Sequence, residues 1–139
     1  MIVLDTNVLS ELMRPAPAEP VIAWVSARPA TSQYTTTVTQ AEILYGILLL
    51  AAGKRRARLL NAADAMFAEE FAGRVLGFGS DAAALYARIA ADRRRVGRPI
   101  SHFDAQIAAI ARANGATVVT RNVADFYGCG VELVDPWNS

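Results

Sequence analysis

The sequence has a single cysteine, Cys129, which excludes an internal disulfide and a zinc site built from cysteines. Net charge is nearly absent as well, since 14 Lys and Arg residues are balanced by 13 Asp and Glu residues and the formal charge is +1. A chain this close to neutral lacks the broad positive field by which many proteins attract a phosphate backbone. An interaction with nucleic acid would therefore depend on where individual charges lie.

Long apolar runs are also missing. The longest, from Ile43 to Ala52, has ten residues, fewer than the roughly 20 of a membrane-spanning helix. No basic segment precedes the first apolar residues, which argues against a signal peptide. We therefore expect a cytoplasmic protein with no membrane anchor. With 53% hydrophobic and 19% charged residues the chain does not have a disordered composition, and its length suits one domain, residues 1–139, with its own core.

Apolar segments of two kinds alternate along the chain and predict the fold. Short segments rich in β-branched residues are apolar throughout, which is typical of parallel strands buried on both faces. Longer segments with helical spacing lie between them, as in α/β proteins. We predict a single α/β domain of three layers, α/β/α, with a mainly parallel central sheet of four to five strands. The expected strands are 2–4, 34–38, 74–78, 116–120 and 131–134, and the expected helices are 8–13, 21–28, 40–52, 54–72, 80–96 and 102–113.

Four acidic residues stand out because they follow apolar strands or open the segments beside them: Asp5, Glu42, Asp104 and Asp125. In a parallel α/β sheet, the carboxyl ends of the strands and the amino ends of the helices meet along one edge, where ligands bind. We therefore expect the four acids to converge on one crevice. Carboxylates so close together cannot all stay ionised without a cation, and an all-oxygen cluster suits Mg²⁺ or Mn²⁺.

Helix capping is the alternative explanation for three of these acids. Thr39–Glu42 and Ser101–Asp104 match the capping box, in which an acid reaches back to a cap three residues earlier. Asn122–Asp125 has the same spacing with an asparagine as the cap. Any one of these carboxylates alone is explained by its cap, but the conjunction of all four favours a divalent-metal site.

Four motifs in this order resemble the PIN-domain ribonucleases, and among them the VapC- and FitB-like toxins of type II toxin–antitoxin modules. The motifs are Val3–Asn7, Thr39–Glu42 followed by Gly46, Asp104–Ala111 and Thr120–Phe126, and the ending Asp135–Trp137 resembles the FitB-like branch. The resemblance covers essentially the whole chain. It implies an Mg²⁺-dependent endoribonuclease that is kept inactive by a small cognate antitoxin protein and that forms a homodimer.

Carried over residue by residue, the resemblance assigns the first three acids of the family's site to Asp5, Glu42 and Asp104, as catalytic residues and metal ligands. The chain departs from the pattern at Asn122, where many relatives have Asp. Others have Asn there and an acid three residues later, so Asp125 is expected to fill the fourth catalytic position. Asn122 would then act as an orienting or phosphate-facing amide.

Three further residues are candidates for contacts beside the acids. Thr6 and Asn7 are expected to hydrogen-bond a ligand carboxylate, a metal-bound water or a phosphate oxygen, with a helix cap as the alternative for Thr6. Arg121 is a candidate for a contact with the substrate. A metal held by Asp5 and Asp104 would lower the pKa of a water and direct it in line at a phosphodiester, and this attack leaves a 5′-phosphate.

Two other functions compete with a toxin-type ribonuclease. The acid missing at Asn122 would also suit a catalytically silent PIN-like module that binds RNA or a protein partner. The aspartate that ends the first strand would suit a phosphatase with Asp5 as nucleophile, but those enzymes resemble Asp-x-Asp-x-Thr and here the second acid is Asn7.

Eight of the 14 basic residues lie in two clusters, Lys54–Arg58 and Arg93–Arg98. Such clusters are usually solvated helix faces, but beside an acidic crevice they would hold RNA phosphates. Glu11 is grouped with the acids of ordinary helix surfaces. The apolar stretch Ile47–Leu50 is explained in part by core burial, and a dimer interface or an antitoxin groove would explain the remainder.

Overall fold

Five short strands form the centre of the computed structural model, which describes residues 1–139. Their order in the sheet is β3-β2-β1-β4-β5, and all four pairings between neighbours are parallel. The predicted sheet of four to five strands is confirmed, and it is parallel throughout. The strands are β1 (Ile2–Leu4), β2 (Gln33–Thr36), β3 (Val75–Leu76), β4 (Thr117–Val119) and β5 (Leu133–Val134).

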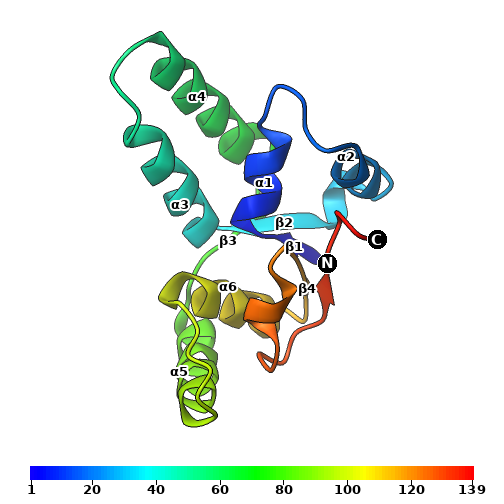
Figure 1. Ribbon diagram of the computed structural model, residues 1–139, viewed down its shortest axis with the longest axis vertical. Coiled ribbons are helices and arrows are strands. Elements are labelled where there is room, and N and C mark those ends of the chain that lie inside the picture. Colours follow the sequence, from blue (N-terminus) through cyan, green and yellow to red (C-terminus); the bar gives the residue numbers. More distant parts are fainter.

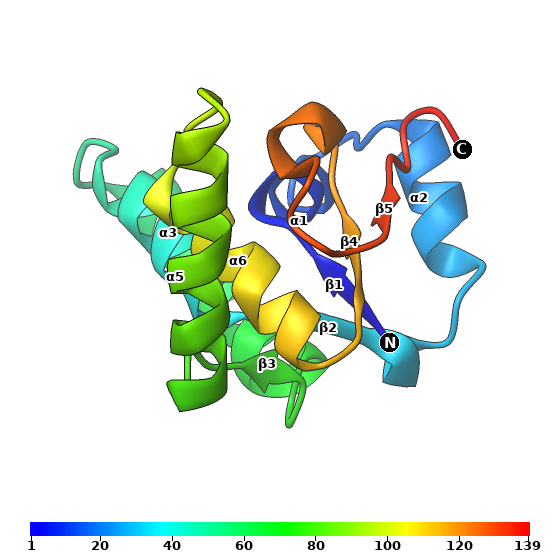
Figure 2. The same ribbon diagram turned by 90° about the horizontal axis from the view of Figure 1, so that it is seen from below.

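Helices cover both faces of the sheet, as the three-layer prediction requires (Figures 1 and 2). Because successive residues of a strand point to opposite faces, Val3 and Val118 belong to one hydrophobic core while Leu4 and Val119 belong to the other. The second core is covered by α1 (Thr6–Leu12), α2 (Glu19–Ser26), α3 (Thr37–Leu48) and α4 (Lys54–Ala65), and the first by α5 (Ser80–Arg95) and α6 (His102–Ala113).

The start of α3 differs from the prediction and decides where Glu42 lies. The expected strand 34–38 ends at Thr36, whose hydroxyl accepts a hydrogen bond from the backbone N–H of Thr39 (3.0 Å) and so caps the helix. The helix therefore begins at Thr37 rather than at residue 40. Thr39 lies within the first turn, so the predicted capping box between Thr39 and Glu42 is wrong.

Most other boundaries lie within two residues of the prediction, but α3 ends at Leu48 rather than at residue 52. α6 spans the predicted residues 102–113, and the Ser101 hydroxyl caps it by accepting from the backbone N–H of Asp104 (3.1 Å). The expected helix 54–72 is α-helical to Ala65 and continues as a π-helical turn, Met66–Glu70. Two short 3₁₀ turns complete the chain, Ala30–Ser32 and η3 (Val123–Phe126). None of the helices has the length and apolar character needed to cross a membrane.

Candidate active site

A hydrophilic cavity of about 580 Å³ lies where β1, α1, α3 and α6 meet at the carboxyl edge of the sheet. Three of the four predicted acids line it, and no hydrophobic residue does. β1 leads directly into this cavity, since the backbone N–H of Asp5 still donates to the Val119 carbonyl (2.9 Å) of β4. The lining residues are Asp5, Thr6, Asn7, Ser10, Glu11, Arg14, Glu42, Asp104 and Asn122.

Asp5 is only 3% exposed, and both of its carboxylate oxygens are held by hydrogen bonds. The backbone N–H of Thr6 donates to Oδ1 (2.8 Å), which makes Asp5 the N-cap of α1. The Thr120 hydroxyl (2.8 Å) and the Asn7 side-chain amide (3.1 Å) both donate to Oδ2. A carboxylate has about four lone-pair positions, so roughly one, on Oδ1, is left for a ligand.

Burial raises the pKa of Asp5 to about 6, and the negative charges of Asp104 and Glu42 add to this effect, although the hydrogen bonds from Thr120 and Thr6 oppose it. The folded state therefore binds a proton at Asp5 more tightly than the unfolded chain does. This residue contributes stability that is present at low pH and lost as the pH rises through about 6.

In metal-free protein, the stability of the wild type relative to Asp5→Asn is therefore expected to be greater at about pH 5 than at about pH 7.5, by roughly 1 kcal/mol. Urea unfolding of both proteins at the two pH values measures this difference. A difference in unfolding free energy that does not change between the two pH values would contradict the assigned pKa shift.

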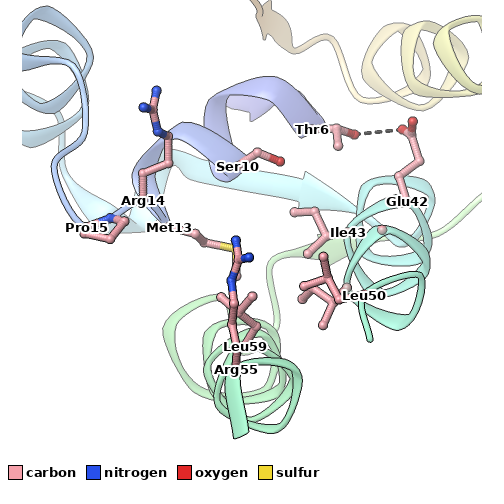
Figure 3. A pocket seen from close by; sticks show the side chains of 12 residues that line it. Thr6, Ser10, Met13, Arg14, Pro15, Glu42, Ile43, Leu50, Arg55 and Leu59 are labelled. Carbon is pink, nitrogen blue, oxygen red and sulfur yellow. Dashed lines mark hydrogen bonds between the residues drawn. The ribbon is translucent and has the colours of Figure 1, made fainter. Parts of the chain in front are cut away.

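Thr6 positions the second acid. Its hydroxyl donates to Glu42 Oε1 (2.7 Å), as Figure 3 shows, and lies 3.1 Å from the hydroxyl of the fully buried Thr39. This contact joins α1 to α3. Of the three contacts expected for Thr6, the structure shows the one to a carboxylate, and the alternative that Thr6 caps a helix is wrong because Asp5 holds that position. Burial also raises the pKa of Glu42, with a smaller contribution from the charge of Asp104.

Asp104 lies in the first turn of α6, so the amino end of this helix delivers its carboxylate to the cavity. Burial raises its pKa and the charge of Asp125 adds to the shift, whereas a hydrogen bond with Ser101 and the charge of Arg93 act in the opposite direction. The predicted cap at Ser101 is real, yet Asp104 also faces the cavity. Capping and a site role are therefore compatible at this position.

Two amides differ in how they face the site. Asn7 is fixed on both sides, because its Nδ2 donates to Asp5 and to the Thr120 hydroxyl (3.2 Å) and its Oδ1 accepts from the backbone N–H of Arg121 (3.1 Å). Asn122 lines the cavity with an exposed side chain that makes no hydrogen bond within the protein. Asn122 is thus available to a ligand, whereas Asn7 orients Asp5.

Two predicted site residues do not line the cavity. Asp125 is exposed in η3 and does not line the cavity, whereas Asn122 does, although the charge of Asp125 is close enough to raise the pKa of Asp104. The guanidinium of Arg121 lies over the indole ring of Trp137, 4.9 Å from its centroid. Its side chain therefore points to the carboxyl-terminal segment.

The sequence reasoning missed Glu11. It is only 8% exposed and lines the cavity, where its Oε2 accepts from the backbone N–H of Ala18 (2.9 Å) and its Oε1 pairs with Arg14 (3.3 Å). The Ala18 hydrogen bond lowers its pKa, and Arg14 contributes. A signal was present, since Asn7, Ser10 and Glu11 have the spacing of one face of α1, and Arg14 continues that spacing just beyond the helix.

A second cavity of about 310 Å³ continues from the first between α1, α3 and α4, and the two share Thr6, Ser10, Arg14 and Glu42 (Figure 3). Its apolar residues come from α3, α4 and the segments directly after α1 and α3, while Arg55 borders it on α4 and Arg14 borders it just after α1. The stretch 47–50 is divided, since Ile47 is buried whereas Leu48 and Leu49 are 53% and 68% exposed. The apolar lining residues are Met13, Ile43, Ile47, Leu50 and Leu59.

The donor set at the first cavity fits a hard divalent cation. Asp5, Glu42 and Asp104 offer only oxygen donors, and none of them forms an ion pair that would balance its charge. No three acidic, histidine or cysteine side chains lie close enough to hold one ion together. Mg²⁺ does not need them to, since it is usually bound through one or two carboxylates and keeps several waters.

Comparisons with known proteins give the family of the chain. Residues 2–127 match the PIN domain. The chain is 39% identical over 137 residues to the "VapC ribonuclease Y4jK" of Sinorhizobium fredii. The alignment covers 99% of this chain and 98% of the relative. It is 38% identical over 138 residues to "Toxin FitB" of Neisseria gonorrhoeae, with 99% of each chain covered.

Solved structures have the same fold. The crystal structure of FitAcB from Neisseria gonorrhoeae has a TM-score of 0.93 at 37% identity and covers 100% of both chains. VapBC-5 from Mycobacterium tuberculosis, described as a member of the VapBC family of toxin–antitoxin systems, has a TM-score of 0.71 at 28% identity and covers 96% of both chains.

Proposed function

The chain belongs to the PIN-domain family, in its group of VapC- and FitB-like toxins, and we propose that it is an Mg²⁺-dependent endoribonuclease that hydrolyses RNA phosphodiester bonds. The observation that carries the proposal is the convergence of Asp5, Glu42 and Asp104, without ion pairs, on one hydrophilic cavity. The ribonuclease name of the Sinorhizobium relative supports RNA as the substrate. The proposal also includes a small cognate antitoxin protein as partner, a homodimeric state and a cytoplasmic location. The similarity to members of toxin–antitoxin systems supports the antitoxin as a partner.

Mg²⁺ or Mn²⁺ would be bound through one or two of the carboxylates of Asp5, Asp104 and Glu42, and waters would complete its coordination. When bound, the ion supplies positive charge that lowers the pKa of a water and stabilises the developing charge on the phosphate. The raised pKa values of the three acids are consistent with this role, because a nearby cation would stabilise the ionised form of each carboxyl group.

The chain's own residues keep these donors in place. Three hydrogen bonds prevent the Asp5 carboxylate from rotating, and Thr6 holds Oε1 of Glu42 while its Oε2 makes no hydrogen bond within the protein. The amide of Asn122, which makes no hydrogen bond within the protein, would donate to a phosphate oxygen. Because hydrogen bonds already hold the carboxylates of Asp5 and Glu42, these groups do not need to reorient during the reaction.

The second cavity offers a path for the RNA strand beyond the scissile phosphate. Arg55 borders it and forms no ion pair, so its charge is available to a phosphate. We expect Arg55→Glu to weaken RNA binding by about tenfold at low salt and to reduce the slope of log affinity against log salt by about one.

Arg58→Glu is the matched control for Arg55→Glu, since Arg58 is exposed on the same helix but does not line the cavity. Fluorescence anisotropy with a labelled single-stranded RNA over a range of salt concentrations measures both variants. If both variants lost the same affinity, α4 would contribute only a diffuse positive charge. The second cavity would then not be the path of the RNA strand.

The chain has Asn122 where a fourth acid is expected. This substitution also suits a second function, that of a catalytically silent PIN-like module that binds RNA or a protein. Isothermal titration calorimetry with Mn²⁺, alone and with a non-cleavable RNA, distinguishes the two functions. A nuclease is expected to bind the metal in a manner that Asp5→Asn abolishes. A silent module would bind no metal even when the RNA is present.

A further inference from the structure

Arg93 is buried, although its basic neighbours on α5 are not. It is 8% exposed, whereas Arg94 and Arg95 are exposed, so the interpretation of the Arg93–Arg98 cluster as a solvated face is wrong for this residue. Its guanidinium forms no ion pair. Burying an arginine without a carboxylate is unfavourable, and an apolar side chain would fill the same space at lower cost. A requirement beyond packing therefore accounts for a guanidinium at this position.

The guanidinium binds backbone carbonyls from two loops. Nη1 donates to the carbonyls of Asp125 (2.8 Å) and Tyr127 (3.0 Å), and Nε donates to the carbonyl of Arg98 (2.7 Å). Nη1 also lies 3.6 Å from Sγ of the fully buried Cys129. The planar fork of an arginine can reach several carbonyls at once, which the single ammonium of a lysine cannot do in the same geometry.

A continuous series of hydrogen bonds leads from this guanidinium to the acidic cavity. Arg93 holds the carbonyl of Asp125, and the backbone N–H of Asp125 donates to the carbonyl of Asn122 (3.0 Å). The backbone N–H of Asn122 then donates to the Thr120 hydroxyl (3.1 Å), which itself donates to Oδ2 of Asp5 (2.8 Å). The turn 122–125 is therefore fixed at one end by Arg93 and at the other by the group that orients Asp5.

We propose that Arg93 is a positioning residue, whose guanidinium holds the segment 122–129 so that Asn122 faces the cavity and the Thr120 hydroxyl stays on Asp5. The catalytic part of this inference rests on the proposed ribonuclease function. The structural part does not, because it concerns the order of a segment that is measurable without any RNA.

Two variants and a control test the proposal. Arg93→Ala removes the donors, and Arg93→Lys keeps a charge but loses the fork and serves as the second variant if Arg93→Ala fails to fold. Arg88→Ala changes an exposed arginine on the same helix that lies outside both basic clusters. We expect Arg93→Ala to lower RNA cleavage by about 10–100-fold, as is typical of groups that orient metal ligands, Arg93→Lys to recover only part of this loss, and Arg88→Ala to leave cleavage unchanged.

Chemical rescue distinguishes the guanidinium from mere packing. Guanidinium ion added at low concentration is expected to restore much of the cleavage by Arg93→Ala, whereas urea, of similar shape and without charge, is expected not to. Equal rescue by both, or cleavage by Arg93→Ala equal to that of Arg88→Ala, would overturn the catalytic part of the proposal.

Amide hydrogen exchange followed by NMR tests the structural part even if the protein cleaves no RNA. In Arg93→Ala, or in Arg93→Lys if that variant is used, the amides of Asn122, Asp125 and Cys129 are expected to exchange about tenfold faster or more, while those of β1 and β4 keep their protection. Unchanged exchange in 122–129, or an equal increase across the whole domain, would contradict a local positioning role.

Discussion

Asp5→Asn is expected to lower the rate of RNA cleavage by about a thousandfold, equivalent to roughly 4 kcal/mol of transition-state stabilisation, while the protein stays folded. Asp5 is the most buried of the three acids, and its single free lone pair is the donor that β1 places in the cavity. Asparagine keeps the shape of the side chain but removes the charge that holds a cation. The loss is therefore expected in kcat, measured under saturating RNA and metal.

Asp64→Asn is the control for this experiment, since Asp64 is exposed on α4 and does not line the acidic cavity. Circular dichroism and the urea midpoint of each variant verify that the fold is retained. If folded Asp5→Asn cleaved RNA as fast as the wild type or Asp64→Asn, the acidic cavity would not be the active site.

Asp104→Asn and Asp125→Asn are expected to separate two acids that the sequence treats alike. Asp104 lines the cavity, so its loss is expected to lower kcat by about a hundredfold. Asp125 is exposed and contributes its backbone carbonyl to Arg93, and an Asp125→Asn substitution does not alter that carbonyl. Asp125→Asn is therefore expected to change kcat by less than about threefold.

The same cleavage assay on both variants measures the difference. A loss in Asp125→Asn as large as that in Asp104→Asn would mean that the carboxylate of Asp125 turns into the cavity when RNA and metal are bound. In that case the fourth catalytic position would belong to Asp125 rather than to the amide of Asn122.

The fold was predictable because its signals are local. Strands that are apolar throughout belong to sheets covered on both faces, and 2–4 and 116–120 correspond to two neighbouring central strands. The Ser101 cap, the amphipathic spacing and the Asn114–Gly115 ending together define α6 at the residues observed. The predicted boundaries were wrong where the signals of two elements overlap, as at Thr36, which both ends a strand and caps the next helix.

The site was predictable in part for the same reason. The carboxyl ends of parallel strands lie on one edge, so Asp5 and Asp104 could be placed together without knowing any long-range contact. Neither the hydroxyl contact from Thr6 to Glu42 nor the burial of Arg93 follows from local sequence, since each depends on how helices pack across the sheet. Asn122 and Asp125 lie three residues apart in one turn, and only the packing of η3 decides which of them lines the acidic cavity.

We propose that the acidic cavity hydrolyses RNA with a bound divalent metal. The most direct test incubates purified, antitoxin-free protein with an end-labelled single-stranded RNA in Mg²⁺, in Mn²⁺ and in EDTA, and identifies the ends of the products. We expect cleavage only with metal, leaving a 5′-phosphate and a 3′-hydroxyl, because water rather than the 2′-hydroxyl is the nucleophile. Cleavage that persists in EDTA, cyclic phosphate ends, or no cleavage with either metal would contradict it.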